Sequence, residues 1–104
     1  FMPKCRITVV QKTLYSDLIQ HYCDPDTVPC ELFEVGESFV LDKADFFAMR
    51  LPVRFCSEAW RSISHYVFAI IQGAEIRWMH NGSMLACCND GARPVVFLLE
   101  RVDD

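Results

Sequence analysis

Polar and apolar positions alternate over one short stretch near the start of the chain. Residues Arg6 to Gln11, "RITVVQ", alternate in this way and are rich in β-branched side chains. That pattern is typical of a strand with one buried face. A second strand is predicted over residues 37–41, entered through Gly36. Both strands are expected to belong to one sheet.

A short helix is predicted between these strands. Leu18, Ile19 and Tyr22 fall on one side of a helix that Ser16 can cap. The helix cannot continue past Pro25, because proline lacks the amide hydrogen that a helix interior needs.

The strongest periodicity lies over residues 57–72. Apolar side chains recur there at intervals of three and four residues, between a predicted cap at Ser57 and Gly73. These side chains are Ala59, Trp60, Ile63, Val67, Ile70 and Ile71. The pattern predicts a long amphipathic helix.

The last third of the chain predicts a hairpin. Two apolar runs, residues 83–88 and 94–102, flank the turn sequence "NDGAR", residues 89–93. The segment 42–55, "DKADFFAMRLPVRF", fits either a helical turn or a loop over the core. The expected order is β-α-β-α-β-β. This order predicts an α+β fold: one small domain over residues 1–104, with a mostly antiparallel sheet, one long amphipathic helix and one short helix.

Composition narrows the classes of function. A hydrophobic fraction of 52% over 104 residues indicates one folded core rather than a disordered chain. The net charge of -4, without a cluster of Lys or Arg, argues against a nucleic-acid partner. No apolar run approaches the roughly 20 residues that a membrane helix needs. No secretory signal is visible either, so we expect a cytoplasmic protein.

Six cysteines are the most unusual feature of the composition. A disulfide framework requires an oxidising compartment, so we expect free thiols. Cys87 and Cys88 are adjacent in a predicted strand, and their side chains must therefore point to opposite faces. We expect one of them to pack in the core and the other to face a site shared with Cys56.

Cys56 directly precedes the long helix. The unpaired amides and the dipole at a helix N-terminus favour a thiolate, which makes Cys56 the preferred reactive thiol. The structural alternative is that Phe55 and Cys56 form a hydrophobic staple beneath Trp60.

Asp90 and Arg93 lie in the hairpin turn. A turn aspartate usually binds its own backbone, and a neighbouring arginine is usually solvated. If Arg93 instead turned inward beside Trp60 and Trp78, it would anchor a carboxylated or phenolic ligand against aromatic walls.

The first hypothesis from these residues is a small enzyme without an organic cofactor, of lyase, isomerase or cyclase type. No nucleotide-binding, metalloprotease or nucleophile-elbow motif is present, which leaves the large cofactor-dependent classes without support. Its pocket would lie between helix and sheet and would bind a small apolar or carboxylated molecule. A site this small could need a homo-oligomer to complete it. The catalytic residues would be Cys56, Asp90 and Arg93, and the substrate-binding residues Trp60, Trp78 and Cys88.

The second hypothesis is a metal or redox module holding zinc or iron. Its ligands would be Cys30, Cys56 and either Cys87 or Cys88, with Cys23 or His21 as the fourth. Thiols in a cytosolic chain are more often catalytic or metal-binding than bridged, although the close Cys or His pairs of a structural zinc site are missing. A third hypothesis is a structural or interaction domain whose cysteines only pack.

Several segments together resemble a family of short, cysteine-containing, uncharacterised bacterial and fungal proteins. They are "YCDP", "PCELFEVGESF", "FCSEAW", "WMH" and "ACCNDGARPVVF". The resemblance covers nearly the whole chain and implies no activity. It implies that the matching positions are Cys30, Cys56, Cys87, Cys88, Asp90, Gly91, Arg93 and Pro94. The segment from Lys43 to Arg54 is longer and more apolar than in that family, which indicates a lid or an oligomer contact.

Overall fold

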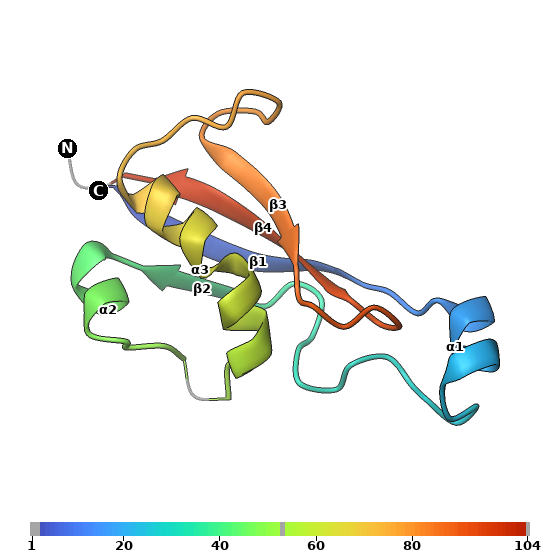
Figure 1. Ribbon diagram of the computed structural model, residues 1–104. Helices are drawn as coiled ribbons and strands as arrows, with labels where there is room; N and C mark the ends of the chain where they lie inside the picture. The colour runs from blue at the N-terminus through green and yellow to red at the C-terminus, as the bar shows by residue number, and fades with distance from the viewer. Residues whose placement is uncertain (1–2, 53, 104) are drawn as a thin grey trace.

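The protein is built on a four-stranded antiparallel sheet in the order β2-β1-β4-β3 (Figure 1). The computed structural model describes residues 3–52 and 54–103. The strands are β1 (Lys4–Lys12), β2 (Ser38–Leu41), β3 (Ser83–Cys87) and β4 (Val95–Val102). The two long strands β1 and β4 pair at the centre, and the predicted hairpin is formed by β3 and β4. The predicted α+β fold is confirmed.

Among the described residues, three helices accompany the sheet, one more than the predicted order contains. They are α1 (Ser16–Tyr22), α2 (Lys43–Phe47) and α3 (Ser57–Ile71). The additional helix is α2, which begins at a capping box: the Asp42 side chain accepts the Asp45 amide hydrogen, and the Asp45 side chain accepts that of Asp42. The ambiguous segment 42–55 is therefore helical only in its first part.

The core lies between α3 and one face of the sheet. Alternate residues of β1, namely Cys5, Ile7 and Val9, are fully buried on that face, and α3 contributes Ile63 and Val67. Burying one such side chain stabilises the fold by about 1.5–3 kcal/mol. The hydrophobic periodicity predicted this helix and its buried side chains.

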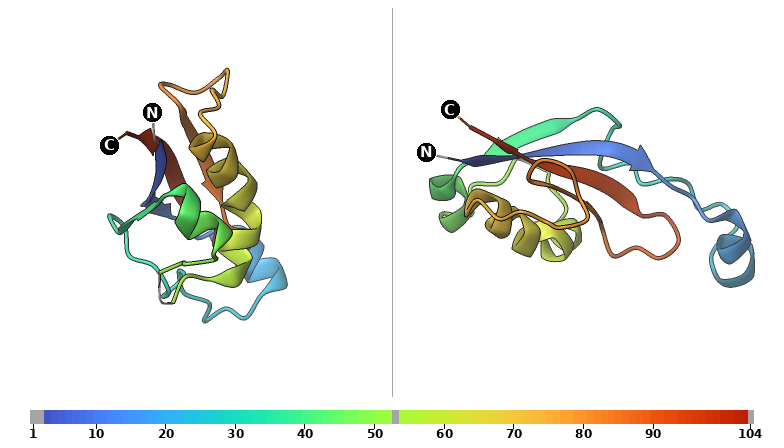
Figure 2. Two further views of the ribbon diagram at one scale, coloured as in Figure 1. Left: turned by 90° about the vertical axis from the view of Figure 1, so that its left-hand side faces the viewer. Right: turned by 90° about the horizontal axis from the view of Figure 1, so that it is seen from above.

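The opposite face of the sheet is open. Figure 2 shows α2 and α3 on the same side of the strands, and none of the helices in the described part of the chain crosses the other side. Val10, Val40 and Leu85 are exposed large hydrophobic residues of these strands.

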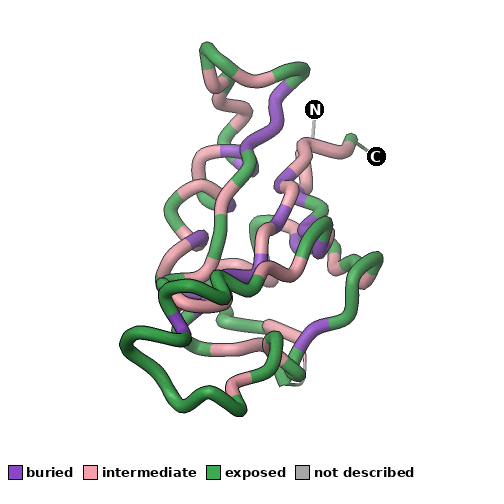
Figure 3. The backbone as a smooth tube through the Cα atoms, turned by 90° about the vertical axis from the view of Figure 1, so that its right-hand side faces the viewer, coloured by how far each residue is buried: buried purple, intermediate pink, exposed green. Residues whose placement is uncertain are grey.

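Helix starts differ from the prediction by one residue. The N-cap of α3 is Cys56 rather than Ser57, and the N-cap of α1 is Tyr15 rather than Ser16. Helix α1 lies beyond the end of the sheet, where the backbone is mostly exposed (Figures 1 and 3). Of its predicted apolar side only Ile19 is buried.

Within the described ranges, no helix combines the length and the apolar content that crossing a bilayer requires.

Candidate functional site

Asp90 organises the turn between β3 and β4. Its Oδ1 accepts the backbone N–H of Ala92 at 3.0 Å and that of Arg93 at 3.3 Å, and its Oδ2 accepts Arg93 Nε at 3.1 Å. The hydrogen bond from the Ala92 N–H makes the largest contribution to lowering the pKa of the Asp90 carboxyl, and the contacts with Arg93 lower it further. The carboxylate is thus committed to its own turn, as the structural alternative from the sequence expects.

Arg93 links this turn to the loop between α1 and β2. Its Nη1 donates to the carbonyl oxygen of Val28 at 2.9 Å, while its Nε binds Asp90. The guanidinium therefore joins two segments that are distant in sequence. These two hydrogen bonds of Arg93 therefore stabilise the fold.

The aromatic walls predicted around Arg93 are not formed by the two tryptophans. Trp60 is buried in the core, with its ring centroid 5.7 Å from that of Phe46 and 6.2 Å from that of Phe55. Trp78 lies in the loop after α3 and is 72% exposed. Trp60 is a core residue because α3 turns it toward the sheet, and Trp78 has no helical periodicity to bury it.

Cys56 lies at the start of α3 and is partly buried against the core. Its side chain makes no capping hydrogen bond. Phe55 and Trp60 occupy the two positions of a hydrophobic staple, and their rings meet edge to face. The first turn of α3 is also joined to the hairpin, since Asn89 Nδ2 donates to Glu58 Oε1 at 2.8 Å.

The two adjacent cysteines have different environments, as strand geometry predicts. Cys87 is exposed, whereas Cys88 packs against the core, and its Sγ accepts the Val95 amide hydrogen at 3.3 Å. Cys5, which the sequence arguments overlooked, is the most deeply buried thiol, and burial raises its pKa to about 12.

The predicted metal ligands do not converge. All six cysteines lie within the described ranges and are free thiols. In the same part of the chain, no three side chains of His, Cys, Asp or Glu are placed to hold a metal ion. The predicted set of Cys30, Cys56 and either Cys87 or Cys88, with Cys23 or His21, is therefore not assembled.

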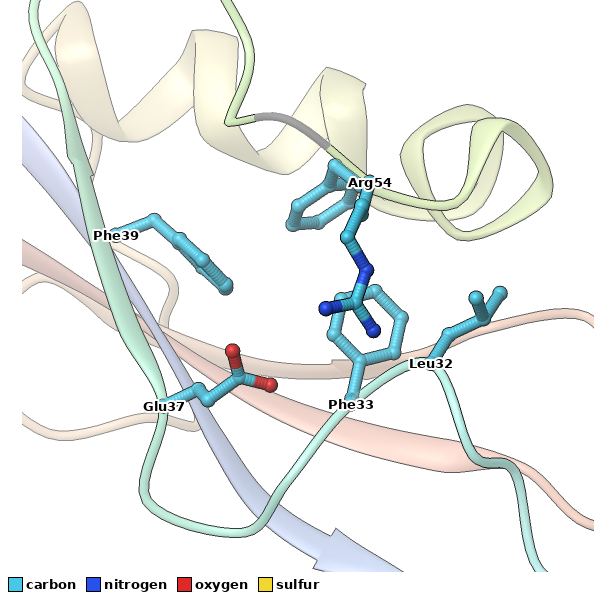
Figure 4. A pocket seen from close by; sticks show the side chains of 6 residues that line it. Leu32, Phe33, Glu37, Phe39 and Arg54 are labelled. Atoms are coloured by element: carbon cyan, nitrogen blue, oxygen red, sulfur yellow. The ribbon is translucent and has the colours of Figure 1, made fainter.

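A different group of residues surrounds a small cavity of about 40 Å³ (Figure 4). Its walls are aromatic: the Phe55 ring lies 5.2 Å from Phe33 and 5.5 Å from Phe39, both edge to face. The lining residues are Leu32, Phe33, Glu37, Phe39, Arg54 and Phe55. The loop before β2, strand β2 itself and the segment before α3 supply them.

Two opposite charges point into this cavity. Figure 4 shows the Arg54 guanidinium and the Glu37 carboxylate directed toward the same space. Among the described residues, Arg54 forms no hydrogen bond or ion pair. Glu37 Oε1 accepts the Glu34 amide hydrogen at 2.6 Å, which leaves Oε2 facing the cavity without a described partner.

A backbone hydrogen bond holds Glu37 in place, and Arg54 has an unusual backbone conformation. The Glu37 carbonyl accepts the Val9 amide hydrogen at 2.9 Å, which fixes Glu37 to the end of the β1–β2 pairing. Arg54 adopts a φ of 75°, in the left-handed region that favours glycine. Backbone strain of this kind clusters at functional sites.

Sequence analysis missed Arg54 and Glu37, because neither belongs to a recognised motif. The usable signal was the set of phenylalanines that flank both charges, Phe33, Phe39 and Phe55. Charged residues placed between aromatic ones at the ends of elements are the usual composition of a binding pocket.

Comparison with known proteins finds no matching family model, no similar curated protein and no similar solved structure. The resemblance to a family of short cysteine-containing proteins therefore stays a prediction.

Proposed function

We propose that the protein binds a small carboxylic acid with an apolar body between Arg54 and Glu37, and catalyses a proton transfer on it without an organic cofactor. The observation that supports this proposal is the pair of charged side chains that face one aromatic cavity without binding each other. The reaction class is that of an isomerase or lyase.

Arg54 supplies the anchor. A guanidinium presents parallel donors that match the two oxygens of a carboxylate. Phe33 and Phe55 line the cavity beside it and offer apolar contact to the body of the ligand, while Arg54 itself is exposed and accessible. This arrangement of a cation beside aromatic walls is the one that sequence analysis expected at Arg93.

The cavity limits the size of the group that it can enclose. Its volume of about 40 Å³ is close to the space of one water molecule and far below that of pockets that enclose whole ligands. We infer that the cavity holds the reacting end of the substrate. The apolar body then lies along the exposed side of Leu32.

Glu37 supplies the base. With a 2-oxo acid bound to Arg54, the Glu37 carboxylate takes a proton from the carbon next to the keto group. The electrons of that C–H bond form a carbon–carbon double bond, and the resulting enolate oxygen is stabilised by the Arg54 guanidinium. Return of the proton to carbon regenerates the Glu37 carboxylate and completes the exchange.

Phenylpyruvate is the probe for this proposal, because it combines a 2-oxo acid with an aromatic body. Its binding to ¹⁵N-labelled protein is followed by NMR, and loss of its carbon-bound protons in D₂O measures the proton transfer. Arg54→Gln is expected to weaken binding at least tenfold, since it removes the charge-assisted contacts. Arg77→Gln, at an exposed arginine outside the cavity, is the matched control.

Glu37→Gln separates catalysis from binding. It is expected to bind phenylpyruvate with an affinity like that of the native protein but to lose at least a hundredfold in protein-dependent exchange. Glu31→Gln, an exposed residue of the same loop, is the control. Undiminished exchange in Glu37→Gln, or undiminished binding in Arg54→Gln, would overturn the assignment.

The same assay tests the residues that sequence analysis favoured. If Cys56→Ala or Arg93→Ala abolishes the exchange while Glu37→Gln does not, the reactive site lies at the hairpin and the start of α3. We expect both of these variants to retain the exchange.

A further inference from the structure

Helix α1 forms an arm that little else in the chain supports. It has seven residues, well below the roughly 12–15 that make an isolated helix even marginally stable in water. Two backbone hydrogen bonds attach the preceding residues to the hairpin: Thr13 N–H to Pro94 O at 3.0 Å and Tyr15 N–H to Ala92 O at 2.9 Å. Among the described residues, α1 shares no extensive contact with another helix or strand. Its attachment to the rest of the chain therefore leaves most of its surface uncovered, with Ile19 as its buried residue.

The arm presents large apolar side chains to solvent. Leu14, Tyr15 and Leu18 are each more than one third exposed, and Tyr22 is 84% exposed. Scattered exposed hydrophobic residues are ordinary, but several on one projecting segment of about ten residues mark an interaction surface.

The open face of the sheet is a second unpartnered surface of the same chain. The register places Thr8, Leu98 and Leu85 side by side across three strands on this face. Exposed Cys87 is paired with Val96 in the next row. The face is mainly apolar over β3 and β4.

The accessible surface of the chain is larger than that of a compact chain of the same mass. Its accessible surface is 6607 Å², whereas a compact chain of 12.0 kDa exposes about 6,000 Å². The excess of about 600 Å² approaches the roughly 800 Å² that each partner buries in a standard protein interface. The radius of gyration of 14.7 Å, against about 13 Å for a compact domain of this length, reflects the same projecting arm.

Charge is divided unevenly along the chain. Residues 13–42 contain seven acidic residues and no Lys or Arg, whereas the remaining residues contain seven acidic and ten basic ones. Residues 13–42, which span α1, the loop after it and β2, therefore carry a formal charge of -7, and the rest of the chain carries +3. On the open face, Arg6 of β1 lies directly opposite Glu100 of β4. The segment that contains α1 and the remainder of the chain thus differ in the sign of their net charge, which favours contact between unlike parts of two copies.

We propose that two copies of this chain pair by exchanging arms, each α1 packing on the open sheet face of its partner. Because each chain carries both surfaces, a two-fold arrangement satisfies them at once and closes the assembly. The pairing is distinct from the function proposed for Arg54 and Glu37, since neither residue belongs to α1 or to a strand of the sheet.

The oligomeric state tests this pairing directly. Light scattering behind a sizing column is expected to give the native chain, at 100 μM, about twice its mass of 12.0 kDa. Leu18→Glu combined with Tyr22→Glu should give the monomer mass, and so should Leu85→Glu on the opposite surface. Trp78→Glu, at an exposed apolar residue outside both surfaces, should remain dimeric. Far-UV circular dichroism confirms that each variant is folded.

Two exposed thiols allow the arrangement itself to be tested. Cys23 follows α1, and Cys87 lies on the sheet face. A short bismaleimide is expected to give a covalent dimer whose linked peptides contain Cys23 of one copy and Cys87 of the other. Either single Ser variant should reduce its yield at least fivefold. A native monomer, a dimer that resists the Glu variants, or a dimer without the Cys23–Cys87 link would each overturn the proposal.

Discussion

Arg93 and Arg54 both lie beside the loop that joins α1 to β2, but the structure uses them differently. Arg93 binds Asp90 and donates to the Val28 carbonyl, so its guanidinium holds the loop against the hairpin. Arg54 lines a cavity with Leu32 and has no bonded partner among the described residues. One arginine stabilises the fold, and the other is available to a ligand.

The difference shows how a structural arginine can be told from a binding one. Hydrogen bonds to charged groups contribute about 1.5–3 kcal/mol when they are made, so a guanidinium with satisfied donors gains little from a ligand. Arg54 also has a left-handed backbone, which costs a non-glycine residue about 1–2 kcal/mol. An unpaired charge on a strained backbone is what a site retained for binding is expected to show.

The largest expected effect concerns Phe55, which belongs both to the start of α3 and to the wall of the cavity that Arg54 lines. Its ring contacts Trp60 in the α3 staple and Phe33 in the cavity wall. Phe55→Ala should lower the free energy of unfolding by about 3 kcal/mol, measured by urea denaturation. Phe47→Ala, at a ring that is 61% exposed, should cost less than about 1 kcal/mol. Equal costs would show that the aromatic cluster is not the common support.

The second prediction sets the two arginines against each other. Arg93→Ala should lower the free energy of unfolding by about 1 kcal/mol, a value reduced for the partial exposure of its ion pair. The affinity for phenylpyruvate should stay within twofold. Arg54→Ala should change stability by less than about 0.5 kcal/mol yet weaken binding at least tenfold. If Arg93→Ala and Arg54→Ala each lose both stability and affinity for phenylpyruvate, then the two arginines do not have separate structural and binding roles.

Glycine at position 54 sharpens the comparison further. Because φ is 75° there, Arg54→Gly should relieve backbone strain and raise the free energy of unfolding by about 0.5–1 kcal/mol while binding is lost. Met49→Gly is a matched control, since Met49 has a φ of 57° and is 63% exposed. It should stabilise similarly and leave binding intact. A destabilising Arg54→Gly would mean that the Arg54 side chain supports the fold.

Local sequence signals accounted for most of the fold. The periodicity of residues 57–72 predicted α3 to within one residue at its end, and the turn sequence around Asp90 predicted the β3–β4 hairpin. Helix starts were shifted because the staple between Phe55 and Trp60, rather than the capping preference of Ser57, fixes where α3 begins.

The candidate site was less predictable because it depends on contacts between distant segments. Glu37 reaches the cavity through the pairing of β2 with β1, and Arg54 through the chain reversal before α3. Neither arrangement can be predicted from residues that are adjacent in the sequence. The cysteines attracted attention by their number, yet packing accounts for the burial of Cys5 and Cys88.

The smallest expected effect is the pH dependence that Asp90 contributes. The pKa of Asp90 is lower in the folded chain than in the unfolded one, so its contribution to stability is fully present above about pH 4 and is lost as the pH falls through the folded pKa. Asp90→Asn keeps a side-chain oxygen for the Ala92 amide but removes the charge. Native stability should therefore fall more steeply than that of the variant between pH 5 and pH 2.

Hydrogen exchange of the Ala92 amide locates this effect. Protection of that amide should decrease with acidification in the native chain and change less in Asp90→Asn, because only the native acceptor loses its charge. Asp45→Asn is the control away from the hairpin, since the pKa of Asp45 is also lowered, there by the Asp42 amide and by Arg50. Its acid dependence should appear in α2 alone. If acid releases the Ala92 amide equally in all three proteins, the charge of Asp90 does not hold the turn, and the structural role of Arg93 must then rest on its bond to Val28.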